Sequence, residues 1–435
     1  MFFLYSLLLT VAFVLLLPRF LFRPKYAAGL RQRFGHLPDF KQDERPVLWL
    51  HCVSVGETNS ARPLVKEFLK EFPEYRLVVS TTTKTGQNLA KEIFKNDADL
   101  FFYFPFDWKF TVHRVLEKIK PKVVILMETE IWFNFVREAH KSGAWVFIAN
   151  GRLSEKSVNR YKWIPNTMRR VLHHVDLALM QTNADMKRLL GVGSRGTKVR
   201  VTGNIKFDQA FEETESALTG ELRHRFAVSK DAPLIVAAST HAPEEKWILQ
   251  AFKEVRANLK TNPPRLLIAP RHPERFAEVE NLIEKSGFRW AKRSANATNL
   301  DENATVILLD SIGELRHVYP LAEIVFVGGS LIPHGGQSIL EPAISGKAII
   351  TGFYTINFAE IVEEFTAQNA LIQLPKLSER EVPAKLAAAF SELLKDKAKR
   401  EHLAKNAFAV MKKNRGATEK TIEHIKTFIL SDGKL

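Results

Sequence analysis

Residues 47–58 read VLWLHCVSVGET, an apolar run that ends in a serine, a glycine and a glutamate. Residues 47–53 have the length and character of a strand that is buried on both faces. The glycine allows the chain to turn tightly into a following helix, and Glu57 falls at the amino end of that helix, where the helix dipole favours a carboxylate. A buried strand, a tight turn and a helix form the repeating unit of an α/β fold with a parallel sheet.

The same alternation continues along the whole chain. Strand-like runs form two series, at residues 47–53, 76–80, 123–127, 145–149 and 177–181, and at residues 234–238, 265–269, 306–309, 324–327 and 348–351. Helices are expected between them, for example over residues 61–72, 86–94, 112–119 and 244–259. The pattern predicts two Rossmann-like domains, residues 23–207 and 208–435, divided at the charged stretch 208–231. It leaves open whether the last helix packs back on the first domain.

Composition narrows the class of protein. The 435 residues include 63 lysines and arginines against 48 acidic residues, a formal net charge of +15. With 46% hydrophobic and 26% charged residues, the chain is neither wholly disordered nor a polytopic membrane protein. Cys52 is the single cysteine, so an intramolecular disulfide is impossible. The excess positive charge fits nucleic acid, an anionic membrane or a phosphorylated substrate.

The amino terminus predicts a membrane anchor over residues 1–22. Residues 1–18 contain no charged side chain, and five basic residues follow between positions 19 and 33. The apolar tract is just long enough to cross a bilayer, which takes about 20 residues, but it could equally lie in one leaflet. The basic cluster places the rest of the chain on the cytoplasmic side. A cleaved signal peptide is disfavoured, because the tract lacks a basic start and a small-residue cleavage site.

Charged side chains follow three strands of the first series. They are Glu57, the pair Glu128 and Glu130, and Arg152. Ligands of parallel sheets bind beyond the carboxyl ends of strands, so these side chains are candidates for one site. Paired acids suit acid–base chemistry or a hydroxylated ligand, and arginine suits a phosphate or carboxylate. An acid favoured by the helix dipole at Glu57, and solvated turns at the other positions, are the ordinary structural alternatives.

The second series carries residues suited to a nucleotide. Arg271 follows one strand, Gly313 and Glu314 follow another, and the glycine-rich stretch 328–338 leads from a third strand into a helix. Guanidinium binds phosphate in bidentate fashion, and backbone N–H groups at a helix start bind it too. No Walker lysine motif is present and no GxGxxG follows a strand, which disfavours an ATPase or a dinucleotide oxidoreductase. The adjacent His173 and His174 would point apart, which disfavours a metal pair.

Together these segments resemble the bacterial Kdo transferases, membrane-bound glycosyltransferases that move 3-deoxy-D-manno-octulosonic acid (Kdo) from CMP-Kdo onto a lipid A precursor. The resemblance implies a GT-B architecture, in which two Rossmann-like domains face each other across a cleft, with no cofactor and no tightly held metal ion. The matching stretches run in order from residue 31 to residue 343, with NFAEI beyond them at 357–361: RQRFG, HCVSVGET, STTTKTG, ETEIWFN, ANGRLS, VTGNIKFD, AASTHAPEE, APRHPERF, DSIGEL, FVGGSL and GGQSILEPA.

The resemblance also implies a role for each matching residue. Glu57 would be the general base that deprotonates an acceptor hydroxyl, and this hydroxyl would displace CMP with inversion. Glu128, Glu130 and Arg152 would line the acceptor or sugar side. Many relatives carry His-Asn where this chain has Gln337-Ser338, although serine can still cap the helix that follows. The donor CMP-Kdo would be bound by Lys206, Arg271, His272, Ile312, Gly313, Glu314, Ser330, Gly336, Ser338 and Glu341.

The implied partners are CMP-Kdo, the lipid A precursor and the surface of the inner membrane, and not nucleic acid. Residues 152–174 carry six basic residues against Glu155, which fits either a solvated helix face or contact with anionic lipid headgroups. Two alternatives remain. One is another membrane-associated GT-B glycosyltransferase that uses a different nucleotide sugar. The other, suggested by charge alone, is a membrane-tethered nucleic-acid-binding protein, for which the sequence contains no recognition motif.

Overall fold

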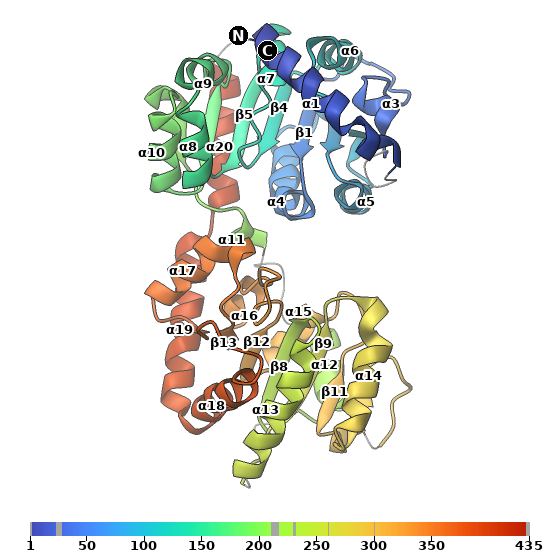
Figure 1. The fold of residues 1–435 in the computed structure, drawn as a ribbon, viewed down its shortest axis with the longest axis vertical. Helices are drawn as coiled ribbons and strands as arrows, with labels where there is room; N and C mark the ends of the chain where they lie inside the picture. The colour runs from blue at the N-terminus through green and yellow to red at the C-terminus, as the bar shows by residue number, and fades with distance from the viewer. Residues whose placement is uncertain are drawn as a thin grey trace. The chain divides into compact units, whose positions relative to one another are not determined.

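The structure is a computed structural model that describes residues 2–22, 28–209, 217–228, 232–259, 261–299 and 301–431, without the side chains of residues 18–22. The side chain of Arg19, together with Arg23, Lys25 and part of the stretch 208–231, therefore lies outside the described residues. The chain forms two compact units (Figure 1). Unit 1 comprises Met1–Gln209 and Asn414–Leu435, and unit 2 comprises Ala210–Lys413.

Unit 1 is built on a parallel sheet of seven strands in the order β3-β2-β1-β4-β5-β6-β7. The order reverses at β1, whose Leu48 pairs with Leu77 of β2 on one side and with Val123 of β4 on the other. This reversal is a topological switch point, beyond which ligands of such sheets bind. The strands are β1 (Val47–Cys52), β2 (Arg76–Thr81), β3 (Ala98–Tyr103), β4 (Val123–Met127), β5 (Trp145–Gly151), β6 (Leu177–Met180) and β7 (Val199–Val201).

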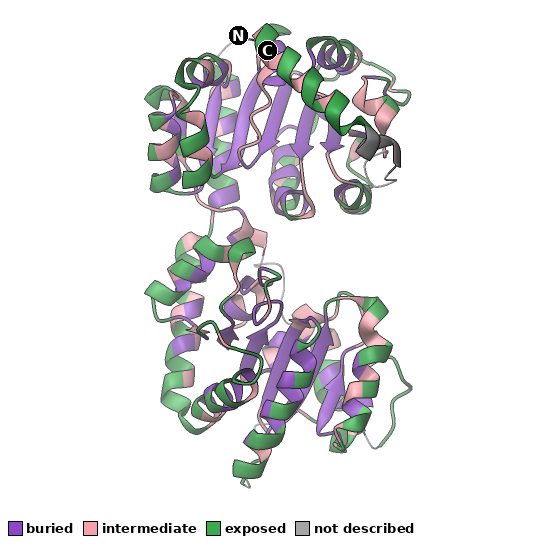
Figure 2. Cartoon of the chain, viewed as in Figure 1, coloured by how far each residue is buried: buried purple, intermediate pink, exposed green. Residues whose placement is uncertain are grey.

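Helices cover both faces of this sheet, and the two apolar cores lie between sheet and helices (Figure 2). One face carries α4 and α20, and α20 is contributed by the end of the chain, where Ile425 and Ile429 pack into the core. The main helices are α4 (Val55–Glu71), α5 (Lys84–Ile93), α6 (Lys109–Ile119), α7 (Phe133–Lys141), α8 (Glu155–Tyr161), α9 (Pro165–Leu172), α10 (Asn183–Gly191) and α20 (Ala417–Ser431).

Unit 2 repeats the plan with strand order β10-β11-β9-β8-β12-β13-β14, again parallel, and with its switch point between β8 and β12. The strands are β8 (Leu234–Thr240), β9 (Arg265–Pro270), β10 (Trp290–Lys292), β11 (Val306–Leu308), β12 (Ile324–Val327), β13 (Ala348–Thr351) and β14 (Ile372–Gln373). The main helices are α13 (Glu244–Asn258), α14 (Phe276–Lys285), α16 (Leu340–Ile344), α17 (Ala359–Ala367), α18 (Val382–Lys395) and α19 (Lys397–Asn414).

The predicted α/β class with two Rossmann-like sheets is confirmed, and each predicted strand is present with its ends shifted by at most two residues. Four strands were not predicted: β3, β7, β10 and β14. All lie at sheet edges, and all but the first have only two or three residues, too few to produce a recognisable apolar run. The helix predicted at 61–72 begins earlier, at Val55, because Ser54 caps it.

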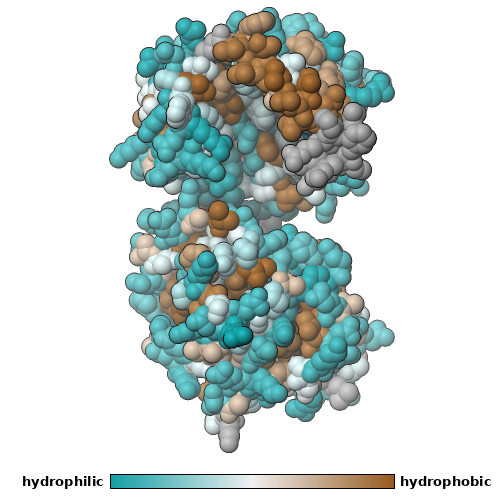
Figure 3. All heavy atoms as spheres, in the orientation of Figure 1, coloured by the Kyte–Doolittle hydropathy of each residue, from teal (hydrophilic) through white to brown (hydrophobic). Residues whose placement is uncertain are grey.

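One side of the first helix, α1 (Phe2–Phe22), packs against the rest of unit 1. The hydroxyl of Tyr5 donates to Asp107 Oδ2 at 2.8 Å, and Trp108 Nε1 donates to Thr10 Oγ1 at 2.9 Å. The other side exposes a row of apolar side chains over α1 (Figure 3). Among the described residues, no helix has the combination of length and apolar character that crossing a membrane requires. The exposed apolar residues of α1 are Phe3, Leu4, Leu7, Leu8, Val11, Val14, Leu15, Leu16 and Leu17.

Candidate active site

Glu57 lies in the first turn of α4, directly beyond β1 at the switch point of unit 1. Its carboxylate accepts hydrogen bonds from the Val53 N–H at 2.7 Å and the Ser54 hydroxyl at 3.0 Å, while Ser54 Oγ accepts from the Glu57 N–H at 3.4 Å. The sequence S-x-x-E is that of a capping box, but the carboxylate here binds the N–H of Val53, one residue before the cap Ser54. The side chain is only 6% exposed, and burial, with added repulsion from Glu128 and Glu130, raises the pKa of Glu57 to about 7. Such a carboxylate can take up a proton near neutral pH.

Glu128 follows β4, on the other side of the switch point from Glu57. Its carboxylate accepts from Arg152 Nε at 2.7 Å and from Lys206 Nζ at 3.3 Å. Its backbone has a φ of +54°, a left-handed conformation that is uncommon outside glycine and costs on the order of 1–3 kcal/mol at such sites. The strain and the two ion pairs fix the direction in which this buried carboxylate points.

The structure therefore gathers five of the predicted site residues at the carboxyl edge of one sheet. Burial, and secondarily the charge of Glu128, also raise the pKa of Glu130. Lys206, which the sequence assigned to the donor-binding set, lies at the start of α11 (Lys206–Gln209) in unit 1, and its Nζ lies 3.3 Å from Glu128 Oε1. The result is a group of three carboxylates and two cations that can hold both a hydroxyl and an anionic group.

Unit 2 contains a pocket of about 220 Å³ beyond the carboxyl ends of β8, β9 and β11. Three residues of the predicted donor set, Arg271, Ile312 and Gly313, line it together with Ser239 and Ser311. The Arg271 backbone N–H donates to Thr240 O at 3.0 Å, which ties the end of β9 to the end of β8. The pocket thus combines a guanidinium, two hydroxyl-bearing residues and a glycine turn, a set that suits a nucleotide phosphate.

Two residues of the predicted donor set, Glu314 and Ser330, form hydrogen bonds within unit 2. The Glu314 carboxylate accepts from Arg293 Nε at 2.8 Å and from the Ser311 hydroxyl at 2.7 Å, and the Arg293 bond lowers the pKa of Glu314. The buried Ser330 hydroxyl donates to Val327 O at 2.6 Å and accepts from the Gly352 N–H at 2.8 Å. Both residues shape the turns around the pocket.

The remaining predicted donor residues lie near the switch point of unit 2. Glu341 lies in the first turn of α16. The expectation that Ser338 caps this helix is wrong, because Ile339 is the N-cap residue, although Ser338 Oγ does accept from the Leu340 N–H at 3.4 Å. The Gly336 N–H donates to Gly329 O at 2.8 Å. The half-exposed ring of His272 packs against the His241 ring, with centroids 5.3 Å apart.

The sequence did not identify Glu244 as a site residue, yet it organises the glycine turn. This fully buried carboxylate accepts from the N–H groups of Gly329 at 2.7 Å, of Ser330 and Leu331 at 3.0 Å each, and of His241 at 3.0 Å. Burial raises the pKa of Glu244 to about 7 although these bonds lower it. In the sequence, Glu244 and Glu245 are recognisable only as two acids in the first turn of a helix, where the helix dipole commonly favours carboxylates.

The glycine turn after β12 also approaches the end of β8 closely. A Cβ atom added at Gly328 would lie 2.7 Å from Ser239 O, so no larger residue fits there. The nearby His241 ring packs on His334, with centroids 4.1 Å apart, and burial, with the neighbouring His334, lowers the pKa of His241 to about 4. His241 is therefore neutral at pH 7. Within the described ranges, no three His, Cys, Asp or Glu side chains form a group that could hold a metal ion.

Comparison with known proteins gives similarity over nearly the whole chain. A family model described as 3-deoxy-D-manno-octulosonic-acid transferase (kdotransferase) matches residues 28–209. A 3-deoxy-D-manno-octulosonic acid transferase of Haemophilus influenzae is 34% identical over 406 residues, which cover 93% of this chain and 92% of that protein.

Solved structures with lower identity share the fold. The UDP-GlcNAc 2-epimerase of Neisseria meningitidis, bound to UDP-GlcNAc, matches with a TM-score of 0.58 and 14% identity over 88% of this chain and 100% of that chain. A glycosyltransferase of Rickettsia africae matches with a TM-score of 0.56 and 14% identity over 89% of this chain and 99% of that chain. The chain thus has a GT-B-like fold, with one parallel Rossmann-like sheet in each unit.

Proposed function

Because the chain belongs to the 3-deoxy-D-manno-octulosonic acid (Kdo) transferase family and is a glycosyltransferase of that family, we propose that it transfers Kdo from CMP-Kdo to a lipid A precursor. The observation that carries the proposal is the buried Glu57, whose pKa is raised to about 7 at the switch point of unit 1. A base of that pKa matches a reaction in which a hydroxyl must lose its proton near neutral pH.

In the proposed reaction Glu57 takes the proton of an acceptor hydroxyl as the hydroxyl oxygen attacks the anomeric carbon of Kdo. The bond from that carbon to the phosphate oxygen breaks, its electron pair leaves with CMP, and the configuration inverts. Arg152 and Lys206, which both pair with Glu128, would bind the carboxylate of the sugar. Glu130 completes the acceptor side.

The donor nucleotide is proposed to bind in unit 2. Arg271 would pair with the phosphate and stabilise the negative charge that develops on departing CMP. Gly313 and Ile312 would lie against the cytidine from the opposite wall of the 220 Å³ pocket. Neutralising the leaving group in this way needs no metal ion.

We also propose that the enzyme works on the cytoplasmic surface of the inner membrane and that α1 holds it there. The support is the row of apolar side chains on α1, of which Phe3 is 82% exposed and Leu15 is 75% exposed. Soluble surfaces rarely carry a contiguous apolar row of this kind unless it meets a membrane or a partner. Replacing Leu8 and Leu15 with glutamate is expected to release the protein from lipid vesicles in a flotation assay, whereas unchanged flotation would contradict this placement.

Competition for donor binding tests the choice of nucleotide. CMP is expected to displace CMP-Kdo from the protein in a titration, and UDP is not. The reverse order would assign the protein to a different nucleotide sugar. Salt-sensitive binding of duplex DNA without turnover of CMP-Kdo would instead favour a nucleic-acid-binding protein.

A further inference from the structure

Three histidine rings, which we call the histidine group, meet at the carboxyl edge of the sheet in unit 2. His241 follows β8, His272 follows β9, and His334 lies in the glycine turn after β12. The His241 ring contacts both of the others, with its centroid 5.3 Å from that of His272 and 4.1 Å from that of His334. Three separate segments of the chain thus bring one titratable side chain each to the same place.

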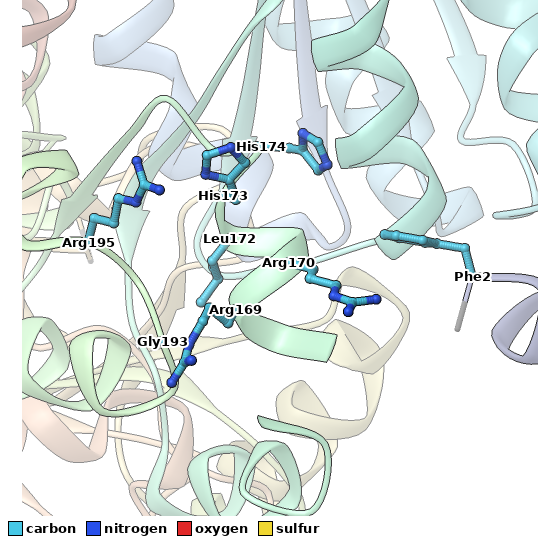
Figure 4. A pocket seen from close by; sticks show the side chains of 8 residues that line it. All are labelled: Phe2, Arg169, Arg170, Leu172, His173, His174, Gly193 and Arg195. Carbon is cyan, nitrogen blue, oxygen red and sulfur yellow. The ribbon is translucent and has the colours of Figure 1, made fainter. Parts of the chain in front are cut away.

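This contact distinguishes the histidine group from other basic hollows of the protein. A hollow of about 520 Å³ in unit 1 is also lined by arginines and histidines, but the side chains of Arg170 and Arg195 point in different directions there (Figure 4). A single anion could not bind both of them. The rings of the histidine group, in contrast, are close enough for one ligand to affect all three.

His241 is the buried member of the group. The residue is only 6% exposed, and its Nδ1 lies 3.1 Å from Ser239 O. Because a carbonyl oxygen only accepts hydrogen bonds, Nδ1 carries the proton and Nε2 holds a lone pair. This Nε2 is buried and has no hydrogen-bond partner among the described residues. An apolar side chain would fill the same space without the cost of an unpaired nitrogen, so packing alone does not explain a histidine here.

The histidine group adjoins the proposed phosphate site. Ser239, whose carbonyl binds His241, lines the 220 Å³ pocket, and Arg271, which also lines it, directly precedes His272. The Arg271 N–H donates to the carbonyl of Thr240, the residue before His241, at 3.0 Å. A phosphate bound by Arg271 would therefore lie beside the histidine group.

The outer members, His272 and His334, are accessible to a ligand. The His272 side chain is 44% exposed, and His334 is exposed. Histidine is the side chain that most readily exchanges a proton near neutral pH, and a nearby anion favours its charged form. Two imidazolium rings that both contact His241 would repel each other, so one proton is expected rather than two.

The charges around the group favour a proton on it only when an anion is bound. Glu245 is paired with Arg275 at 2.6 Å, and Glu244 already accepts four N–H groups. Glu274 Oε1 lies 3.8 Å from His272 Nδ1 and is mostly exposed, so solvent weakens its effect. The positive charge of Arg271 disfavours a proton on the neighbouring rings, and a bound phosphate would cancel that charge.

We propose that the histidine group is a proton-linked anion subsite: when a phosphodiester binds at Arg271, one outer ring takes up a proton from solvent and pairs with the phosphate. This role deepens the proposed donor site of unit 2 and rests on it, and it adds His241 and His334 to the residues of that site. His241 stays neutral and supports the outer rings. Because the protonated ring is favoured only in the complex, the affinity should fall as the pH rises.

The test uses the full-length protein and cytidine 5′-methyl phosphate, a diester like the donor, whose single negative charge does not change near neutral pH. Its binding enthalpy is measured by calorimetry at pH 7 in buffers with different enthalpies of ionisation, because the dependence on the buffer gives the number of protons taken up. We expect a net uptake of up to one proton. The affinity should fall by up to about tenfold per pH unit between about pH 6.5 and 8.5. Cytidine, which has no phosphate, should bind without proton uptake.

Two variants locate the proton. His272→Asn/His334→Asn is expected to abolish both the uptake and the pH dependence, and to bind the diester at low pH only as well as the wild type does at high pH. His224→Asn/His402→Asn removes two exposed histidines of unit 2 on α12 (Ala217–Arg225) and α19, and as the matched control it should change neither quantity. Equal melting temperatures establish that both variants are folded.

Four results would overturn the proposal. Binding of the diester without proton uptake is one, and equal uptake with cytidine is another, since the proton would then not depend on the phosphate. Uptake that persists in His272→Asn/His334→Asn would assign the proton to another group, such as the buried Glu244 carboxyl. Equal loss of uptake in the control variant would show that the effect is not local. If neither cytidine nor the diester binds, the donor site proposed for unit 2 fails, and this role fails with it.

Discussion

At the scale of single residues, Glu57 combines an observed structural role with the proposed role of general base. Its carboxylate binds the Val53 N–H and the Ser54 hydroxyl at the start of α4, and burial raises its pKa to about 7. An alanine substitution would remove both roles together. Glutamine, which is also found at this position of capping boxes, retains a hydrogen-bond acceptor but cannot take up the proton.

The Glu57→Gln variant is therefore expected to fold normally and to lose transfer by about 10²–10⁴-fold, the usual contribution of a general base. CMP binding should be retained. Transfer rate, CMP titration and thermal unfolding measure the three quantities. Glu67→Gln, a solvent-facing change on the same helix, is the matched control. Near-normal turnover by Glu57→Gln would remove Glu57 as the base.

The raised pKa of Glu57 also predicts the pH profile of the reaction. Only the ionised carboxylate accepts a proton, so kcat/KM should rise with pH through about 7 and then level off. Glu128→Gln removes a negative charge that helps to raise this pKa, so the rising limb should move to lower pH, whatever happens to the plateau. A limb that stays in place in Glu128→Gln would show that another group controls the profile.

Arg271 lines the pocket of unit 2 that is proposed to bind the donor. Replacing it with glutamine should weaken CMP binding by about 10–100-fold, because hydrogen bonds to charged groups contribute about 1.5–3 kcal/mol. Lys285→Gln, at the end of α14, removes one charge from unit 2 without touching the pocket. Calorimetric titration with CMP distinguishes the two variants, and equal affinities would contradict the phosphate assignment.

At the scale of elements, the glycine turn after β12 is held by a single side chain. Glu244→Gln replaces a carboxylate that accepts four N–H groups with an amide that brings a donor to the same place. The expected cost is about 2–3 kcal/mol of stability, seen as a lower denaturant midpoint, together with weaker CMP binding. Glu254→Gln, exposed on the same helix α13, should change neither quantity. An unchanged midpoint in Glu244→Gln would contradict the role given to Glu244.

The helices and strands also show which parts of the fold the sequence patterns could predict. Buried strands such as β4 are predictable because their residues are apolar throughout, whereas the two-residue β14 has no pattern of its own and forms because β13 offers it a partner. The turn residues Glu57 and Glu128 could be predicted because strand ends are marked by glycine and charge. The intramolecular partners of the Ser330 hydroxyl and the Glu314 carboxylate could not be predicted, since Gly352 and Arg293 are more than 20 residues away in the sequence.

At the scale of the whole molecule, two units with the same sheet topology carry different kinds of candidate site residues. Unit 1 carries the carboxylates and the apolar helix α1, and unit 2 carries the guanidinium and glycine turn that suit a nucleotide. The net charge of +15, which alone suggested nucleic acid, includes the exposed arginines Arg169, Arg170 and Arg195. It also includes Arg152 and Lys206, which lie in the candidate active site. The ligand that such basic residues can bind depends on where they lie in the fold, and composition does not reveal this.

The central claim is that this chain moves Kdo from CMP-Kdo to a lipid A precursor. The most direct measurement is the mass of the lipid product after the purified full-length protein is incubated with CMP-Kdo and lipid IVA. We predict a product heavier than the acceptor by one or more whole Kdo residues, with release of CMP, and no such product from Glu57→Gln. An acceptor of unchanged mass with the wild-type protein, under conditions in which it binds CMP, would contradict the account.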